Sequence, residues 1–310
     1  MTTVKIGSRG SDLALWQANF VKDTIEKCNT GVMCDITIIK TTGDKLRDVK
    51  LDASVDKGFF TKEIEEALMD KRIDIAVHSL KDLPTELPPT LTLGAVSKRE
   101  IANDVLISKD KKKLAELPRG AKIGTSSPRR KSQLMHYRHD FRLMDIRGNL
   151  PTRIRKVDSS DLDAVVVAYA GVKRLGFESH ISEIIPFDIM LPAISQGALG
   201  IEIRKNDLAT QTIINCLNDV SSYHVAIAER SLLRKMQGGC QVPVGAYGTI
   251  TNDKLTLEGM ISSLDGKQLI RKKMTGNAKD SESIGIQLAD DILRSGGERI
   301  LREFRNDATC

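Results

Sequence analysis

The sequence predicts an α/β protein that ends in a smaller α+β domain, and three observations support this fold class. Strand-like and helix-like segments alternate through the first ninety or so residues, and the same alternation returns between residues 121 and 204. After about residue 220 the pattern changes to a helix, three strands in hairpin succession and a further helix. Alternating strands and helices are typical of a parallel sheet covered by helices. A length of 310 residues suits two domains of ordinary size or three small ones.

Three strands are expected in the first α/β segment, at residues 4–8, 34–40 and 73–79. Two amphipathic helices separate them, at 11–28 and 60–72. We expect Ser11 to cap the first helix, and the apolar face of that helix to carry Leu13, Trp16 and Phe20. The stretch 41–58 shows no usable period, and a polar loop of this length is usually functional or mobile.

The middle and the end of the chain are read in the same way. Strands are expected at 121–127, 141–148 and 162–171 and in the second half of 191–204. The two helices between them begin at Pro128 and near Pro151. In the C-terminal part, a helix at 224–236 precedes strands at 246–250, 254–262 and 269–276 and a last helix at 283–297.

The composition excludes several classes of protein. Hydrophobic residues make up 40% of the chain and charged residues 28%, as in ordinary globular proteins. No apolar run approaches the roughly 18 residues that a membrane span needs, and the N-terminus lacks the pattern of a secretory signal. The five cysteines form no CxxC or metal spacing, so we expect neither a disulfide scaffold nor a metal site. These features favour a cytoplasmic protein that makes no membrane contact.

One segment supplies the positive charge of the chain. Residues 119–156 hold eleven Lys and Arg against Asp140 and Asp145, a local +9, whereas the rest of the chain carries −3. Such a segment indicates an anionic partner, although a solvated basic face is the plain alternative. Nucleic-acid binders usually interleave aromatic residues for stacking, but only Tyr137 and Phe141 lie in this segment. A small polyanion is therefore favoured over nucleic acid.

Arginines follow two of the expected strands. The motif SSPRR begins a helix, where hydroxyls and backbone N–H groups bind anions, and Arg129 and Arg130 can fork onto carboxylates. The motif IRGNLPTRIR repeats the arrangement with Arg147 and Arg153. Each motif alone is also typical of a capped surface helix. Two strand ends of one sheet that both present arginines favour an anion site.

Two further motifs follow strands of the first segment. GSRGS adds Arg9 and Ser11, and it is not a dinucleotide fingerprint because GxGxxG is absent. HSLKDLP places Asp82 just after the strand at 73–79, among cations that keep a carboxylate ionised. Such a carboxylate can stabilise a cationic intermediate or relay protons, and a helix cap is the alternative. His78 is interpreted first as a packed histidine and second as a catalytic one.

The motif QGGCQVP places Cys240 after two glycines, which allow a ligand to approach the backbone closely. An exposed site with a positive bias favours the thiolate, the reactive form of cysteine. Most single cysteines are instead inert and buried, and Cys28, Cys34 and Cys216, which lie in apolar patterns, fit that description.

Together these segments resemble the porphobilinogen deaminase family, also called hydroxymethylbilane synthases. The motifs appear in the order of the family along nearly the whole chain: GSRGSDLALWQ, DKGFFTKEIEEAL, DIAVHSLKDLP, GTSSPRR, IRGNLPTRI, LPAISQGALGIE and GGCQVPVGAY. The resemblance implies two periplasmic-binding-protein-like α/β lobes, residues 1–98 with 197–218 and residues 99–196. It also implies a small α+β domain, residues 219–310, that bears the cofactor cysteine.

The resemblance further implies a reaction and a cofactor. Four porphobilinogen molecules are joined head to tail, with release of ammonia, into linear hydroxymethylbilane. The cofactor is a dipyrromethane attached through a thioether to Cys240. Asp82 is the catalytic carboxylate, a buried anion that stabilises the cation formed as ammonia leaves, and a monomer is expected.

By the same match, the residues implied to hold the acid groups of the cofactor are Lys81, Thr125, Ser127, Arg129, Arg130 and Arg147. The residues implied to bind substrate are Arg9, Ser11, Gln17, Arg153 and Arg174. Lys57 and Phe60 are implied to belong to a lid. Because each porphobilinogen carries an acetate and a propionate, a site dense in arginine suits this chemistry.

A second hypothesis is a non-catalytic two-lobed α/β protein that binds a small polycarboxylate. That hypothesis leaves Asp82 and the cysteine that follows two glycines unexplained. The two hypotheses differ in the intact mass of the protein, because only the enzyme carries a covalent adduct on Cys240.

Overall fold

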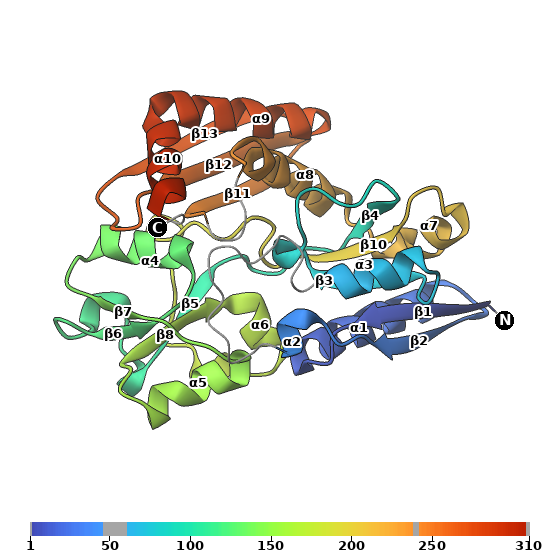
Figure 1. The fold of residues 1–310 in the computed structure, drawn as a ribbon, viewed down its shortest axis with the longest axis horizontal. Coiled ribbons are helices and arrows are strands. Elements are labelled where there is room, and N and C mark those ends of the chain that lie inside the picture. The colour runs from blue at the N-terminus through green and yellow to red at the C-terminus, as the bar shows by residue number, and fades with distance from the viewer. Residues whose placement is uncertain (1, 46–60, 238–241, 308–310) are drawn as a thin grey trace. The chain divides into compact units, whose positions relative to one another are not determined.

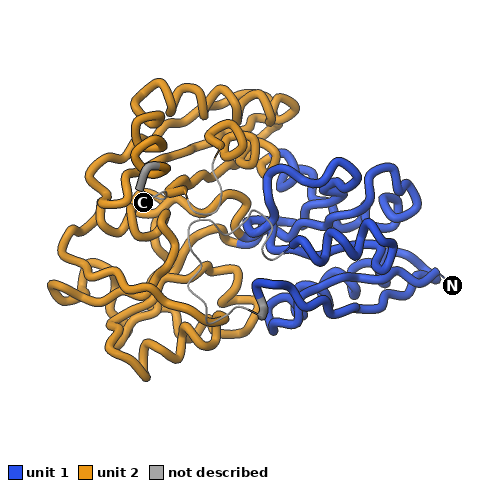
Figure 2. Tube along the Cα trace, in the orientation of Figure 1, with its two compact units in different colours: residues 1–100, 197–224 blue, residues 101–196, 225–310 orange. Residues whose placement is uncertain are grey.

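The structure is a computed structural model, and it describes residues 2–45, 61–237 and 242–307. The chain divides into two compact units, which Figure 2 shows in separate colours. Unit 1 contains residues 1–100 and 197–224, and unit 2 contains residues 101–196 and 225–310. The three predicted domains have finer boundaries, at residues 98, 197 and 219, and these boundaries stay predictions.

Unit 1 is built on a five-stranded sheet in the order β2-β1-β3-β10-β4 (Figure 1). Its strands are β1 (Thr2–Ser8), β2 (Val32–Ile38), β3 (Ile75–Ser79), β4 (Leu91–Val96) and β10 (Leu199–Arg204). β1 runs parallel to β2 and β3, and β10 is inserted antiparallel between β3 and β4. The sequence predicted all of these strands except β4.

Helices cover the sheet of unit 1 and leave it buried on both faces. They are α1 (Asp12–Cys28), α2 (Thr42–Lys45), α3 (Lys62–Met69) and α7 (Leu208–Ile214), with 3₁₀ turns η1 (Leu80–Asp82) and η5 (Asn215–Leu217). Ile75 and Val77 of β3 pack in a cluster with α1, and Ala76 between them packs with α3. Alternate residues of one strand therefore serve two apolar layers, as in a sheet buried on both sides.

Helix α1 buries a different face from the predicted one. Its buried residues are Gln17, Ala18, Val21 and Ile25. Trp16 and Phe20 are exposed, and their rings stack with centroids 5.6 Å apart. The prediction of the apolar face was wrong, because the small and β-branched side chains face the sheet and the bulky rings stack on each other at the surface.

Unit 2 contains a second five-stranded sheet, in the order β7-β6-β8-β5-β9. Its strands are β5 (Asp104–Ser108), β6 (Lys122–Gly124), β7 (Arg142–Met144), β8 (Ala164–Ala168) and β9 (Glu183–Ile184). Its helices are α4 (Pro128–Tyr137), α5 (Leu150–Ser159) and α6 (Tyr169–Arg174), with 3₁₀ turns η2 (Lys109–Lys111), η3 (Leu114–Glu116) and η4 (Glu178–His180). As predicted, α4 and α5 begin with a proline in the first turn.

The two sheets share one plan. In each, three parallel strands are followed by an antiparallel strand and a final edge strand. In unit 1 the antiparallel strand is β10, which returns late in the chain, and in unit 2 it is β5, which comes first. The parallel strands bring the loops that follow them to one edge of each sheet, which is where α/β proteins bind ligands.

The C-terminal part of unit 2 is an antiparallel sheet with helices on one face. Strands β11 (Val244–Thr251), β12 (Lys254–Ser262) and β13 (Leu269–Asn277) pair in sequence order. The helices are α8 (Val220–Lys235), which belongs to this unit from residue 225 onward, α9 (Ser281–Ile292) and α10 (Glu298–Asp307), with turns η6 (Ala278–Asp280) and η7 (Leu293–Gly297). Of these, the sequence did not predict α10.

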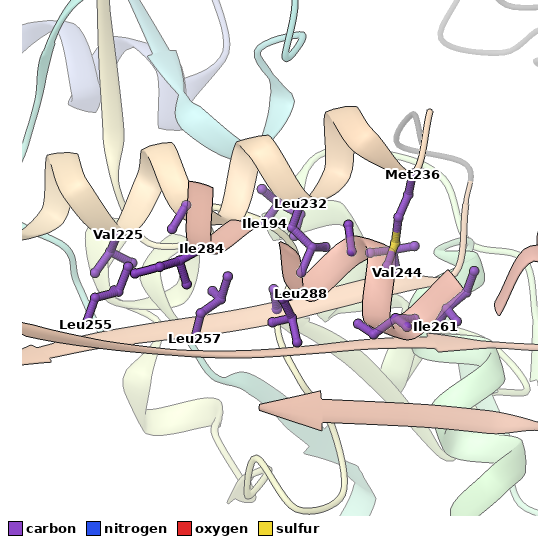
Figure 3. Packing of buried hydrophobic residues seen from close by; sticks show 14 of the residues in the cluster. Ile194, Val225, Leu232, Met236, Val244, Leu255, Leu257, Ile261, Ile284 and Leu288 are labelled. Carbon is purple, nitrogen blue, oxygen red and sulfur yellow. The ribbon is translucent and has the colours of Figure 1, made fainter. Parts of the chain in front are cut away.

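The core of this part lies between the sheet and the helices α8 and α9. Figure 3 shows Leu232 of α8 and Leu288 of α9 on the side of the sheet to which Leu257 and Ile261 of β12 belong, and all four are in one cluster. Each of these residues has no exposed surface, and burial of one such side chain contributes about 1.5–3 kcal/mol. The predicted fold class, two α/β lobes and a small C-terminal α+β domain, is confirmed.

Within residues 2–45, 61–237 and 242–307, no helix is both long enough and apolar enough to cross a lipid bilayer.

Candidate active site

A pocket of about 90 Å³ lies in unit 1 at the edge of the sheet where β1 and β3 end. It brings together four of the predicted site residues, which are Arg9, Ser11, Gln17 and Asp82. The other residues that line it are Leu13, Ala14, Thr61, Val77, His78 and Ser79. The sequence therefore predicted the polar groups of α1 and of the loop after β3, and it missed Thr61 and Ser79.

The start of helix α1 makes the pocket suitable for an anion. Ser11 caps the helix, and its hydroxyl accepts a hydrogen bond of 3.3 Å from the N–H of Ala14. The remaining N–H groups of the first turn carry the positive end of the helix dipole. Arg9, which is half-buried, adds a full positive charge two residues before the cap. A carboxylate of a ligand is well matched to this combination.

Gln17 and Asp82 give the pocket two different polar groups. Gln17 is only 2% exposed, and its side-chain amide donates a hydrogen bond of 2.8 Å to the hydroxyl of Ser79. Asp82 ends the 3₁₀ turn that follows β3, and it is exposed. The expectation of a buried anion was therefore wrong for Asp82. A single short turn carries the carboxylate past the end of the strand, beyond the packed part of the sheet.

His78 also lines this pocket, and it contacts a carboxylate that the sequence did not predict. Its Nε2 lies 3.0 Å from Oε2 of Glu202 on β10, and both side chains are buried. His78 is buried, as its interpretation as a packed residue requires, but it packs against a carboxylate and not only against apolar side chains. An imidazole is thus held against a buried carboxylate at the wall of a polar pocket.

Unit 2 contains a buried cluster of charges. Asp104, the first residue of β5, has no exposed surface. Its Oδ1 accepts hydrogen bonds from Nε and Nη2 of Arg130, at 3.1 and 2.7 Å, and from the amide of Gln196 at 3.0 Å. Its Oδ2 forms an ion pair with Nη1 of Arg129 at 2.8 Å.

The two arginines keep Asp104 ionised. Burial alone would raise the pKa of Asp104, but attraction to Arg129 and Arg130 outweighs burial and holds that pKa well below its usual range. Each guanidinium also donates to a backbone carbonyl, Arg129 to Leu191 at 2.7 Å and Arg130 to Val166 at 3.0 Å. Both side chains are therefore fixed in position before any ligand binds.

The other predicted residues of unit 2 lie after its parallel strands. Thr125 is buried just after β6, and Ser127 precedes α4 without a capping bond from its hydroxyl. Arg147 is exposed after β7, and Arg153 in α5 donates a bond of 2.8 Å to the carbonyl of Gly148. Arg174 is half-buried at the end of α6, and in unit 1 Lys81 is half-buried in the turn that contains Asp82.

Part of the positive charge of residues 119–156 is neutralised by neighbouring acids. Besides the pair on Asp104, ion pairs join Lys131 to Asp145, Arg138 to Asp140 and Lys122 to Asp161. Five of the eleven basic residues in the segment are thus already paired. The charge left for a ligand is smaller than the sequence indicated.

Three predicted residues, Lys57, Phe60 and Cys240, lie outside the described residues. In the part of the chain that the structure describes, no group of three or more His, Cys, Asp and Glu side chains is placed to hold a metal ion.

Comparison with known proteins gives two matching family models. The model described as porphobilinogen deaminase, dipyromethane cofactor binding domain, matches residues 4–212, and the model described as its C-terminal domain matches residues 223–294. The chain belongs to the porphobilinogen deaminase family. The pocket in unit 1 and the Asp104 cluster both lie in the region that matches the cofactor-binding domain of these deaminases, whereas Cys240 lies in the C-terminal match.

Two curated porphobilinogen deaminases show the extent of the similarity. The protein from Carboxydothermus hydrogenoformans is 47% identical over 305 residues, which cover 98% of each chain. The one from Pelotomaculum thermopropionicum is 48% identical over 304 residues, which cover 98% of this chain and 97% of that protein. Among solved structures, the methionine binding protein MetQ aligns over 73% of this chain and 94% of its own, with 11% identity and a TM-score of 0.43.

Proposed function

We propose that this protein is a transferase that joins four porphobilinogen molecules head to tail, with release of ammonia, into linear hydroxymethylbilane. One observation supports this function above the others. Residues from two separate parts of unit 1 form one pocket that contains a cation, a helix N-terminus and a carboxylate: Arg9, Ser11 and Asp82. A substrate with two acid groups and a ring that becomes cationic needs this combination.

Asp82 acts on the positive charge that develops as ammonia leaves. When the aminomethyl group of porphobilinogen loses ammonia, the pyrrole ring carries the positive charge. A carboxylate beside that ring stabilises the cation more than it stabilises the neutral ground state, and this difference lowers the barrier. Because Asp82 is exposed at the pocket, it reaches a ligand without displacing any packed side chain.

Arg9, Ser11 and Gln17 bind the substrate in this proposal. Arg9 and the N-terminus of α1 take a carboxylate of the substrate, and Gln17, held by Ser79, fixes the direction of a polar group. Arg153 and Arg174, on α5 and α6 of unit 2, are proposed to bind further acid groups. These roles are supported by family membership and by the positions of the residues after parallel strands.

The cofactor is a dipyrromethane that we propose is attached through a thioether to Cys240. When bound, it supplies the pyrrole to which the first substrate is joined. Around the start of α4 the chain offers groups that suit its carboxylates, since the Ser127 hydroxyl makes no capping bond and the contacts of the Arg129 guanidinium with other described residues are made through Nη1. The proposed ligands for its acid groups are Lys81, Thr125, Ser127, Arg129, Arg130 and Arg147.

The intact mass of the purified protein tests this proposal. The mass is expected to exceed that of the bare sequence by a two-ring adduct, which peptide mapping places on Cys240. Cys240→Ala is expected to remove the adduct and the turnover, whereas the control Cys216→Ala, at an exposed cysteine of unit 1, keeps both. A wild-type protein with the bare mass and no release of ammonia from porphobilinogen would contradict the function.

The role of Asp82 is tested separately. Asp82→Asn is expected to keep the adduct and lose turnover by about 10²–10³-fold, the usual effect of removing one electrostatic partner of a transition state. A turnover close to that of the wild type would remove Asp82 from the role. We also propose, from the sequence alone, that the protein is a monomer of the cytoplasm that binds no nucleic acid.

A further inference from the structure

A buried pair of ionisable groups forms part of the wall of the Asp82 pocket. The side chain of His78 is 5% exposed, and that of Glu202 is not exposed at all. Nε2 of the histidine lies 3.0 Å from Oε2 of the glutamate. The second oxygen, Oε1, is buried without a hydrogen bond among the described residues. His78 therefore lies at the wall of the pocket, and Glu202 lies in the closed interior.

The sheet places the two side chains on one face. β3 and β10 are antiparallel, with His78 opposite Gly200 and Glu202 opposite Ala76. Ala76 packs in the cluster under α3, so His78 and Glu202 lie on the α3 side of the sheet. Glu65 on α3 is near them, and its pKa is raised, chiefly by burial and also by the charge of Glu202. The charged groups on the pocket side are Arg9 and Asp82.

The charge of the pair depends on how many protons the imidazole carries. With a single proton on Nε2, His78 is neutral, Glu202 is ionised and the pair carries one buried negative charge. A second proton, on Nδ1, makes the pair neutral overall. In that second state the imidazolium is the counter-charge of the buried carboxylate. No cation other than the imidazole forms a described ion pair with Glu202.

We propose that His78, oriented by Glu202, accepts the proton that leaves carbon when two substrate-derived pyrrole rings are joined. This inference rests on the proposed function. From the second addition onward, the free α-carbon of the ring added last attacks the methylene carbon of the cation derived from the next porphobilinogen. A carbon–carbon bond forms, the C–H bond at that α-carbon breaks, and its electron pair restores the aromatic ring. The proton passes to Nδ1 of His78 and then to the ammonia released in the same cycle.

A base separate from Asp82 gives each group one task. Asp82 must stay ionised to stabilise the cation, and a carboxylate that took the proton would lose its charge at that moment. A histidine held by a buried carboxylate is a well-attested general base, because the carboxylate fixes its tautomer and stabilises its protonated form. Glu202 is accordingly a positioning residue, and His78 is the group that meets the reacting ring.

Deuterated substrate tests the inference. The probe is porphobilinogen with deuterium at its free α-carbon, used with wild-type protein, His78→Gln and Glu202→Gln that all carry the cofactor adduct. His78→Gln is expected to lower turnover by about 10²-fold or more and to show a primary deuterium isotope effect larger than that of the wild type. Glu202→Gln is expected to show a smaller loss, and the double variant is expected to be no slower than His78→Gln, because the pair acts as a unit.

His136→Gln is the matched control. His136 lies in unit 2 and its Nδ1 is 2.9 Å from the carbonyl oxygen of Gly266, a contact of similar length outside the pocket. It is expected to leave the isotope effect unchanged. An active wild type together with a His78→Gln variant that shows the wild-type isotope effect would overturn the inference and leave the proposed function standing. A wild type without turnover would instead remove the proposed function itself.

Nuclear magnetic resonance of the protein labelled with ¹⁵N-histidine provides a test that needs no turnover. The expected spectrum has the His78 proton on Nε2, shifted far downfield by the bond to Glu202, and this signal is lost in Glu202→Gln. A spectrum with the proton on Nδ1 and none on Nε2 would overturn the inference, because Nδ1 would then have no lone pair to accept a proton. This measurement decides the question even where His78→Gln does not fold.

Discussion

Replacement of Asp104 by asparagine tests whether the buried charge cluster holds unit 2 together. The substitution keeps the size of the side chain and one acceptor oxygen, and it removes the only negative charge that contacts Arg129 and Arg130 among the described residues. Both guanidiniums are less than one-tenth exposed. The variant therefore contains two buried positive charges without a counter-charge.

The expected loss is large because it combines burial with charge. Removing one partner of a buried ion pair costs about 3–5 kcal/mol, since the other partner is left uncompensated. A loss of 1 kcal/mol lowers Tm by roughly 2–4 °C in a protein of 150–250 residues. Asp104→Asn is therefore expected to lower Tm by roughly 6–20 °C, and the asparagine oxygen that remains for Arg130 favours the lower part of this range.

Calorimetry of the wild type, Asp104→Asn and the control Asp145→Asn measures this effect. Asp145 forms a surface ion pair of 2.7 Å with Lys131, which lies on the same helix as Arg129 and Arg130. The loss of this pair is expected to change Tm little. Adding Arg130→Met to Asp104→Asn is expected to recover part of the loss, because it removes one of the stranded charges. If Asp104→Asn has the same Tm as Asp145→Asn, the cluster does not stabilise the fold and the reasoning is wrong.

The same cluster predicts the direction of a pH effect. The pKa of Asp104 is lower in the folded protein than in the unfolded chain, so its contribution is complete above the unfolded value of about 4 and is lost as the pH falls below it. The difference in Tm between the wild type and Asp104→Asn is therefore expected to be largest near neutral pH and to narrow in acid. A difference that widens in acid would contradict this assignment.

Three further predictions concern other parts of the molecule. Gly285→Ala is expected to lower the free energy of unfolding by about 1–3 kcal/mol, and with it the urea midpoint, because a Cβ there would lie 2.2 Å from the backbone oxygen of Ala228. An unchanged midpoint would show that α8 and α9 can move apart to admit the methyl group. Gln17→Leu removes the bond to Ser79 and is expected to raise KM for porphobilinogen about 10-fold with kcat nearly unchanged, and a fall in kcat alone would contradict a binding role. Burial raises the pKa of Cys34 to about 11, so iodoacetamide at pH 8 is expected to label the exposed Cys28 first, and mapping that finds Cys34 labelled first would contradict its burial.

The sequence predicted the strands that alternate with helices or follow one another in hairpins, together with β10, and it missed β4, β5 and β9. β1, β2 and β3 alternate with helices in the chain, so hydrophobic period and connection length were enough to place them. β5 begins with Asp104, a residue that no apolar pattern places inside a sheet. The burial of Asp104 depends on two arginines about 25 residues later, which lie on α4, the helix that follows β6. Such a partnership has no signature in a local window.

The candidate site divides in the same way. Arg9, Ser11 and Asp82 directly follow parallel neighbouring strands, and topology alone predicts that they meet at one edge. Glu202 reaches His78 because β10 returns, more than a hundred residues later, between β3 and β4. The polar motifs could be found in the sequence, whereas Glu202 could be identified as the partner of His78 only once the strand order was known.

The arginines that we propose to bind acid groups in unit 2 fall into two groups. Arg129 and Arg130 are bound to Asp104 and to backbone carbonyls, so their positions are set by the fold and a ligand gains no electrostatic energy from the part of their charge that Asp104 already balances. Arg147 and Arg153 of residues 119–156, and Arg174 beyond that segment, are more exposed, and we propose that they supply the larger share of ligand selectivity. A rigid inner pair with an outer set that a ligand can reach suits a product that gains acid groups with every cycle, because the outer side chains can shift to each new carboxylate while the inner pair holds one fixed reference point.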